Sequence, residues 1–169
     1  QEEVFTTLEA LTSQMDYIQR LRAVGEYDRQ SLINQNWRYD ERDVTQWVKD
    51  ALSHYWGGPK LTENPLFGLR IVAEAVESHN GSPANALRSV LREAIDRVKP
   101  EGERRFTAEW VLYNILEMKF LEGKKVRDIA RRLAMSEADL YRKQRVAIDA
   151  VAKAILDMES QVRNGAREG

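Results

Sequence analysis

Apolar residues recur along this chain at intervals of three and four, the spacing that places side chains on one face of a helix. The pattern predicts helices over about 2–23, 40–55, 65–78, 83–98 and 106–121. Glycine and proline separate these segments, as in Gly57-Gly58-Pro59, because glycine frees the backbone and proline cannot donate the next hydrogen bond. No segment shows sustained alternation bounded by hairpin turns. The sequence therefore predicts an all-α, multi-helix bundle.

Two shorter helices with a break between them are predicted over 124–152. Ser136 follows the break and Asp139 stands three residues later, which indicates an N-cap of the capping-box type. Two helices that cross over a short turn need a small residue at their closest approach, and Ala130 supplies it. The inward-facing residues are predicted to be Val126, Ile129, Ala130, Leu133, Leu140, Ala147, Ile148 and Val151. This pattern indicates a helix-turn-helix whose second helix projects outward.

The same stretch resembles a known family. The matching pieces are Phe120-Leu121-Glu122-Gly123-Lys124, Val126-Arg127-Asp128-Ile129-Ala130-Arg131-Arg132-Leu133, Met135-Ser136, Tyr141-Arg142-Lys143-Gln144-Arg145 and Ala147-Ile148. Over about 106–152 the chain is similar to the C-terminal promoter-reading region of bacterial sigma factors and to the related helix-turn-helix of response regulators. The family usually has glycine where Ala134 stands, so the backbone there must stay in an allowed region. The first two thirds of the chain match no domain that we can name.

The resemblance implies that the second helix reads double-stranded DNA. Ala138, Tyr141, Arg142 and Arg145 would lie on its outward side, together with Glu137, and the two arginines could pair with guanine edges or phosphates. Lys124, Lys125, Arg127 and Arg131 would hold the DNA backbone. Between Lys119 and Arg145 nine basic and four acidic residues give a local charge of +5, against a net −1 for the whole chain. Such a contrast is typical of a nucleic-acid-binding face.

Two heptad-like apolar stripes lie near the ends of the chain. One comprises Val4, Leu8, Leu11, Met15 and Ile18, and the other comprises Ile148, Val151, Ile155, Met158 and Val162. They can pack against each other within one chain, or they can build a two-fold dimer that matches two DNA half-sites. The dimer is the favoured interpretation. On this interpretation the chain consists of a dimerisation helix (1–25), a helical domain of unassigned role (26–100), a helix-turn-helix module with an extended last helix (101–162) and a flexible tail (163–169).

Composition excludes several kinds of chemistry. The 169 residues include no cysteine, which rules out disulfides and thiolate sites, and the two histidines lie apart without a metal-ligand spacing. No Ser-His-Asp order, His-Glu-x-x-His motif or nucleotide-binding loop occurs, so we predict neither enzyme activity nor a cofactor.

No apolar run approaches the ~20 residues of a membrane span, and no secretory signal is visible, so the expected location is cytoplasmic. The chain begins at Gln1, and we interpret it as part of a longer protein with further domains.

Two functions remain open from the sequence. The first is a DNA-binding transcriptional regulator, or the regulatory domain of a larger bacterial protein. The second is a protein-interaction or dimerisation module of a signalling protein. Glu137 and Asp139 favour the second, because they place negative charge where a DNA-reading helix meets phosphate.

Overall fold

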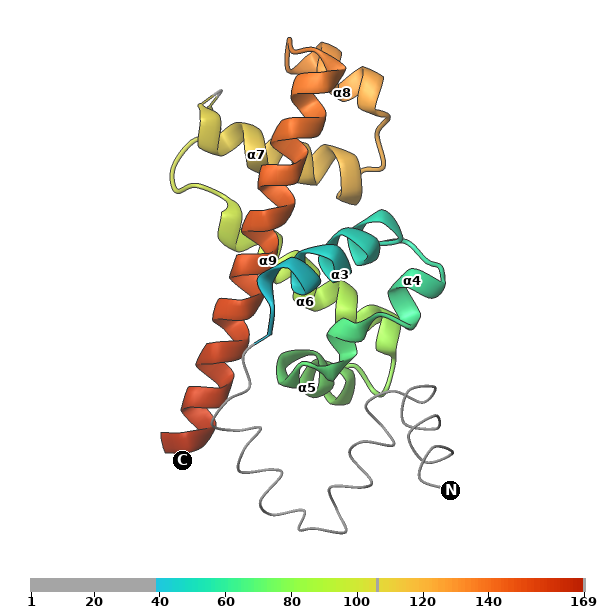
Figure 1. Cartoon of the computed structure of the whole chain (residues 1–169), viewed down its shortest axis with the longest axis vertical. Helices are drawn as coiled ribbons and strands as arrows, with labels where there is room; N and C mark the ends of the chain where they lie inside the picture. Colours follow the sequence, from blue (N-terminus) through green and yellow to red (C-terminus); the bar gives the residue numbers. More distant parts are fainter. Residues whose placement is uncertain (1–38, 106, 169) are drawn as a thin grey trace, which may run out of the picture. The chain divides into compact units, whose positions relative to one another are not determined.

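The structure is a computed structural model that describes residues 39–105 and 107–168. Every regular element in these two ranges is helical, which confirms the predicted all-α fold (Figure 1). From Asp40 onward the chain forms one compact unit. The predicted helix over 1–25 and its stripe lie outside the described residues. The elements are α3 (Glu41–Ser53), α4 (Pro59–Thr62), the 3₁₀ turn η1 (Pro65–Gly68), α5 (Arg70–Ser78), α6 (Pro83–Val98), α7 (Ala108–Leu116), the π-helical turn η2 (Glu117–Leu121), α8 (Val126–Arg132) and α9 (Glu137–Glu168).

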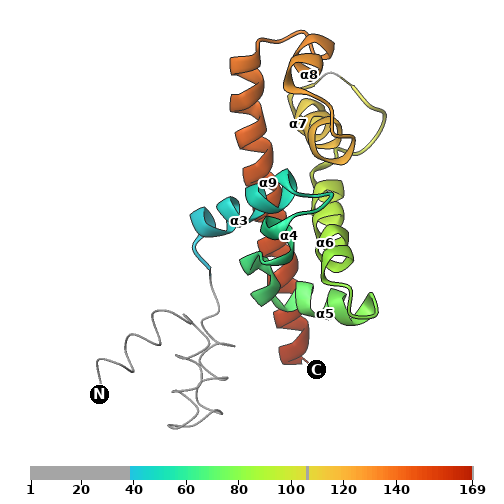
Figure 2. The ribbon, with the colours of Figure 1, turned by 90° about the vertical axis from the view of Figure 1, so that its right-hand side faces the viewer.

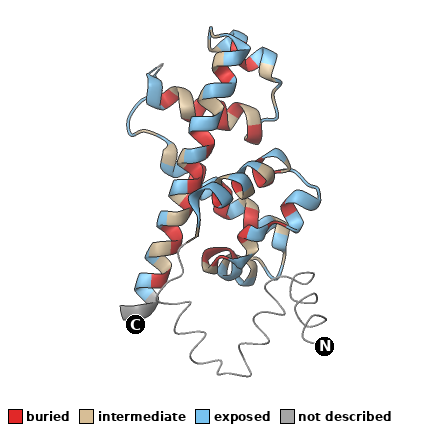
Figure 3. Cartoon of the chain, in the orientation of Figure 1, coloured by how far each residue is buried: buried red, intermediate tan, exposed pale blue. Residues whose placement is uncertain are grey.

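The last helix, α9, is the element around which the unit is built. It packs against α3, α5, α6, α7 and α8. Figure 2 shows α7 and α8 beside its N-terminal half and α3, α5 and α6 beside the remainder. Its buried positions form a stripe along the helix (Figure 3). No helix in the described ranges is both long and apolar enough to cross a membrane.

The C-terminal stripe that the sequence analysis assigns to a pairing seam is used inside the chain. Ile148, Val151, Ile155 and Met158 are at most 5% exposed, and only Val162 is partly exposed. Helix α9 contacts helices on both sides of residue 100, and the chain from Asp40 onward forms one compact unit. A helix of 32 residues is long enough to span both predicted segments.

Several helices begin where the sequence places a capping side chain. Asp40 accepts a hydrogen bond from the backbone N–H of Arg42 at 2.8 Å, and Thr107 accepts one from Trp110 at 3.4 Å. Such caps satisfy N–H groups that have no partner within the helix. Ser82 precedes Pro83 at the start of α6 without a side-chain cap, so proline alone marks that start.

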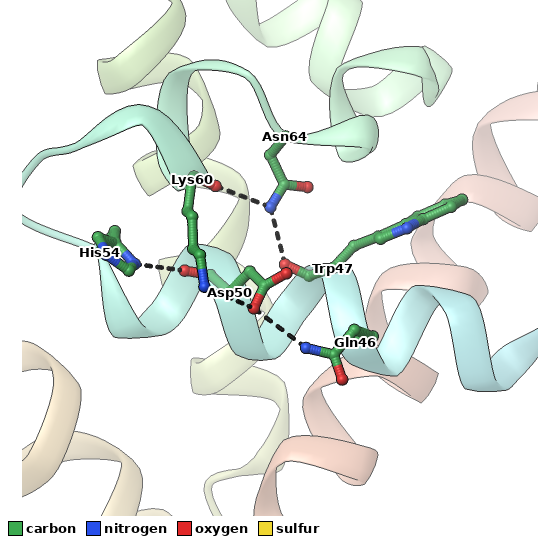
Figure 4. A network of polar contacts seen from close by, with 6 residues as sticks. All are labelled: Gln46, Trp47, Asp50, His54, Lys60 and Asn64. Carbon is green, nitrogen blue, oxygen red and sulfur yellow. Dashed lines mark hydrogen bonds and ion pairs between the residues drawn. The ribbon is translucent and has the colours of Figure 1, made fainter. Parts of the chain in front are cut away.

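Asn64 joins three segments rather than capping one helix. Its Oδ1 accepts from the N–H of Leu66 at 2.9 Å, while its Nδ2 donates to the carbonyls of Trp47 and Lys60 at 2.8 and 3.0 Å (Figure 4). The same network includes Asp50, which accepts from Gln46 at 3.0 Å. Asn64 is 4% exposed, so these bonds replace the water that it loses on folding.

The predictions for 65–78 and for the C-terminal tail differ from the structure. The single helix expected over 65–78 is divided, because Leu69 adopts an extended conformation between η1 and α5. The tail predicted to fray after Val162 continues as α9 to Glu168. Arg163 anchors this extension, since its Nε donates to Glu159 at 2.7 Å in a buried site.

Glu159 caps the divided helix from a distance. Its two carboxylate oxygens accept hydrogen bonds from the backbone N–H groups of Arg70 and Ile71, each at 3.0 Å. The N-cap position of α5 is Leu69, which has no side chain able to do so. A carboxylate there also interacts favourably with the positive end of the helix dipole. The C-terminal half of α9 thereby holds α5 in place.

Candidate functional site

The residues predicted to form a helix-turn-helix lie in α8, a four-residue connection and the start of α9. The connection is 133–136, so the chain changes direction there instead of continuing as one rod (Figure 2). A small cluster holds the two helices against α7 and η2. It consists of the buried residues Ile115, Met118, Ile129, Ala130 and Leu140, with Val111, Val126, Leu133 and Met135 partly buried around them. Ala130 is 4% exposed, as expected for the small residue at the approach of two helices.

The turn after α8 closes through two backbone hydrogen bonds. The N–H of Met135 donates to the carbonyl of Ala130 at 2.9 Å, and that of Ala134 donates to Arg131 at 3.2 Å. These are the two bonds of a Schellman motif. Ala134 has φ +55°, in the small left-handed region that glycine adopts without cost. Position 134 therefore has a left-handed backbone although its residue is not glycine.

Ser136 begins α9 as predicted. Its Oγ accepts from the N–H of Asp139 at 3.1 Å, and its carbonyl accepts from Leu140 at 2.9 Å. The Asp139 carboxylate lies 2.8 Å from Lys143 Nζ and 3.8 Å from Arg142 Nη2. The hydrogen bond from Lys143 is the main cause that lowers the pKa of Asp139, with a smaller contribution from Arg142.

These contacts change the electrostatics expected at the start of α9. The negative charge of Asp139 is shared with two cations on the next turn, so it is partly neutralised where DNA would approach. Glu137 remains exposed at the N-terminus of the helix. Of the two acidic residues expected to repel phosphate, Asp139 has its negative charge partly neutralised by neighbouring cations.

The four predicted base-side residues, Ala138, Tyr141, Arg142 and Arg145, are all exposed on α9. The side chain of Arg142 is 72% exposed, and Tyr141 is 54% exposed. Of the predicted backbone contacts, Lys125, Arg127 and Arg131 are exposed, whereas Lys124 is half-buried and pairs with Glu122 at 3.2 Å. Within the described part of the chain, Lys125, Arg127, Arg131 and Arg145 have no ion-pair partner. Their charges are available to an anionic partner.

Two residues of this surface escaped the sequence prediction. Arg132 is exposed in the last turn of α8, beside Arg131. Val146 is 53% exposed on α9, although it immediately precedes the buried Ala147 and Ile148. In the sequence Val146 belongs to the apolar run 146–148 and so looks like a core residue. Its exposure depends on which neighbouring helices cover α9 at that point. Its sequence position alone carries no such signal.

A second cluster of hydrogen bonds joins the loop before α7 to α7 and η2. Arg104 donates to both oxygens of Glu117, at 2.9 and 3.4 Å, and Tyr113 donates its hydroxyl to Glu117 at 3.0 Å. The hydrogen bond from Arg104 is the main cause that lowers the pKa of Glu117. Burial, followed by the hydrogen bond to Glu117, raises the pKa of Tyr113. The guanidinium also lies 5.8 Å from the ring centre of Trp110. These bonds hold the loop before α7 against Tyr113 of α7 and Glu117 of η2, the two elements that precede α8.

A groove of about 550 Å³ continues from the surface between α3 and α9, with Arg145 and Lys153 on one wall and Lys49 on the other. Glu41 and Asp149 also line it, so its charge is mixed. Among the described residues no group of histidine, aspartate and glutamate side chains has the arrangement to hold a metal ion. Comparison with protein families, with curated proteins and with solved structures finds no match to this chain.

Proposed function

We propose that this chain binds double-stranded DNA, with α8 and α9 acting as a helix-turn-helix and the first turns of α9 entering the major groove. The observation that carries the proposal is the exposed pair Arg142 and Arg145 on the helix that follows the turn. Arginine side chains of this kind pair bidentately with guanine edges or with phosphates. In the cell the chain would be a transcriptional regulator, or the regulatory domain of a larger bacterial protein similar to sigma factors.

The charges around α9 favour an anionic partner. Lys125 is the N-cap residue of α8, while Arg131 and Arg132 lie in its last turn. Because these residues are exposed at the ends of one short helix, they can contact the DNA backbone on either side of a groove that α9 enters. Sequence-independent contacts of this type supply much of the affinity of DNA-binding proteins.

The test is a titration of a fluorescently labelled, mixed-sequence duplex at two salt concentrations. We expect binding that weakens steeply as salt rises, because phosphate contacts release counterions. Arg142→Ala or Arg145→Ala should weaken binding by about 1–3 kcal/mol each, and Arg131→Ala should lower the salt slope by about 1. Arg97→Ala is the matched control, since it removes the same charge from α6 and should change little.

A chain that shifts no duplex at low salt would refute the proposal. A second candidate function is then a protein-interaction module, which the exposed Glu137 beside Tyr141 and Arg142 favours. Tyrosine and arginine are enriched among the few residues that supply most of the binding energy at protein interfaces. In that case neither the wild-type chain nor Arg142→Ala shifts a duplex, and Arg142→Ala weakens binding of the partner protein.

A further inference from the structure

Two of the three large apolar side chains that are exposed in the described part of the chain lie on the proposed DNA-reading surface. They are Tyr141 and Val146, at 54% and 53% exposed, and the third is Trp56 in the loop after α3. Everywhere else along α9 the large aliphatic side chains are buried or partly buried. The start of this helix therefore exposes apolar groups that the fold does not use.

Helical stability does not account for Val146. A β-branched side chain loses rotamer freedom in a helix, and alanine or lysine would favour the helix more at an exposed position. Nor does Val146 contribute to the core, which Ala147 and Ile148 reach from the adjacent positions. Its exposure suits a contact made outside the chain.

Each exposed apolar residue stands beside one of the two arginines. Residues four apart are neighbours on a helix surface, so Tyr141 adjoins Arg145 and Val146 adjoins Arg142. The surface thus alternates donors of hydrogen bonds with apolar groups. In the major groove the base edges offer acceptors to arginine, and their one apolar group is the C5-methyl of thymine.

We propose that Tyr141 and Val146 make the DNA-binding surface prefer sites that contain thymine, through contact with its C5-methyl group. The proposal rests on the proposed function and adds its base preference. Arg142 and Arg145 supply hydrogen bonds to guanine or phosphate, while the two apolar residues remove methyl groups from water. Burying one methyl-sized group corresponds to a factor of about four in affinity.

The experiment compares thymine with uracil, which lacks only this methyl group. A random-sequence duplex pool is first enriched on the whole protein, and the enriched pool is then copied with either dTTP or dUTP. We expect the wild-type chain to bind the thymine pool about four-fold more tightly for each methyl contacted. Val146→Ala and Tyr141→Ala should each weaken binding to the thymine pool more than binding to the uracil pool, and so reduce this ratio. Trp56→Ala, the control, should keep the full ratio.

The outcomes separate the two proposals. Equal affinity of the wild-type chain for both pools would overturn the thymine preference alone and leave DNA binding intact. A ratio that survives in both Val146→Ala and Tyr141→Ala would show that other residues read the methyl group, and would overturn the assignment. If the wild-type chain enriches no duplex from the random pool and binds no duplex, the proposed function fails, and this inference fails with it.

Discussion

Glu159 and Arg163, one turn apart on α9, share a buried 2.7 Å hydrogen bond from the arginine Nε to the carboxylate. The same carboxylate accepts hydrogen bonds from the first two N–H groups of α5, a helix that begins 89 residues before Glu159 in the chain. A fully buried charge is stable only when it is paired and hydrogen-bonded, and here both requirements are met by partners from two helices. The pair therefore links the C-terminal part of α9 to the start of α5.

Replacement of Glu159 by alanine should strongly destabilise the fold. The change leaves Arg163 without this buried anion and α5 without its cap, so we expect a loss of about 3–5 kcal/mol in the free energy of unfolding. Glu159→Gln keeps an acceptor for α5 and should lose less. Urea unfolding followed by circular dichroism measures both. Asp157→Ala, on an exposed position of the same helix, is the control, and equal midpoints for Glu159→Ala and that control would contradict the buried-pair interpretation.

Glycine at position 134 should stabilise the chain. Ala134 has φ +55°, where a Cβ is unfavourable and glycine is not. We expect Ala134→Gly to raise the free energy of unfolding by about 1 kcal/mol. The matched control is Ala73→Gly at an exposed position inside α5, which should lower it by about 1 kcal/mol. If both substitutions destabilise equally, the backbone at Ala134 is not left-handed in solution.

Acid should weaken the cluster around Glu117. Because Arg104 lowers the folded-state pKa of Glu117 below its ordinary value of 4.5, the contribution of Glu117 to stability is present above about pH 4.5 and is lost as pH falls through the folded-state pKa. We expect the urea midpoint of the wild-type chain to drop between pH 6 and pH 3. In Glu117→Gln the drop should be smaller, since the titrating group is gone. An identical pH dependence in the two proteins would show that Glu117 is not paired in solution.

Ile155 should contribute to stability within a single chain. It is fully buried against helices of the same unit, so Ile155→Ala should cost about 2–5 kcal/mol through the cavity it leaves. If the unit unfolds as one chain, the thermal midpoints of wild type and variant stay constant over a hundred-fold range of protein concentration. A midpoint that rises with concentration in the wild type would instead indicate that α9 takes part in a dimer.

Local sequence signals located most of the helices and the turn of the candidate site. Asp40, Thr107 and Ser136 each cap a helix, and the capping of α3 and α9 follows from a polar side chain placed just before an apolar repeat. Ala130 was identified as the small residue between α8 and α9 for the same reason. These features depend on residues within about five positions of each other. A pattern read along the chain is sufficient to find them.

The division of 65–78 at Leu69 and the continuation of α9 past Val162 were missed, because both depend on one distant contact. Glu159 satisfies the first N–H groups of α5, so that helix can begin after an extended residue that has no cap of its own. In the sequence Glu159 and Arg163 look like an ordinary exposed pair four residues apart. Only the position of α5 shows that they are buried.

The sequence by itself determined that this chain is helical, that Ser136 caps the helix after the turn, and that its basic residues concentrate between Lys119 and Arg145. Tertiary structure decided that the C-terminal apolar stripe is covered and which described side chains remain exposed. The periodicity of α9 is the same for a dimer seam and for an intrachain core, since a helix presents its apolar face identically to any partner. The neighbours that fill that face lie far away in the chain, and no local spacing encodes them.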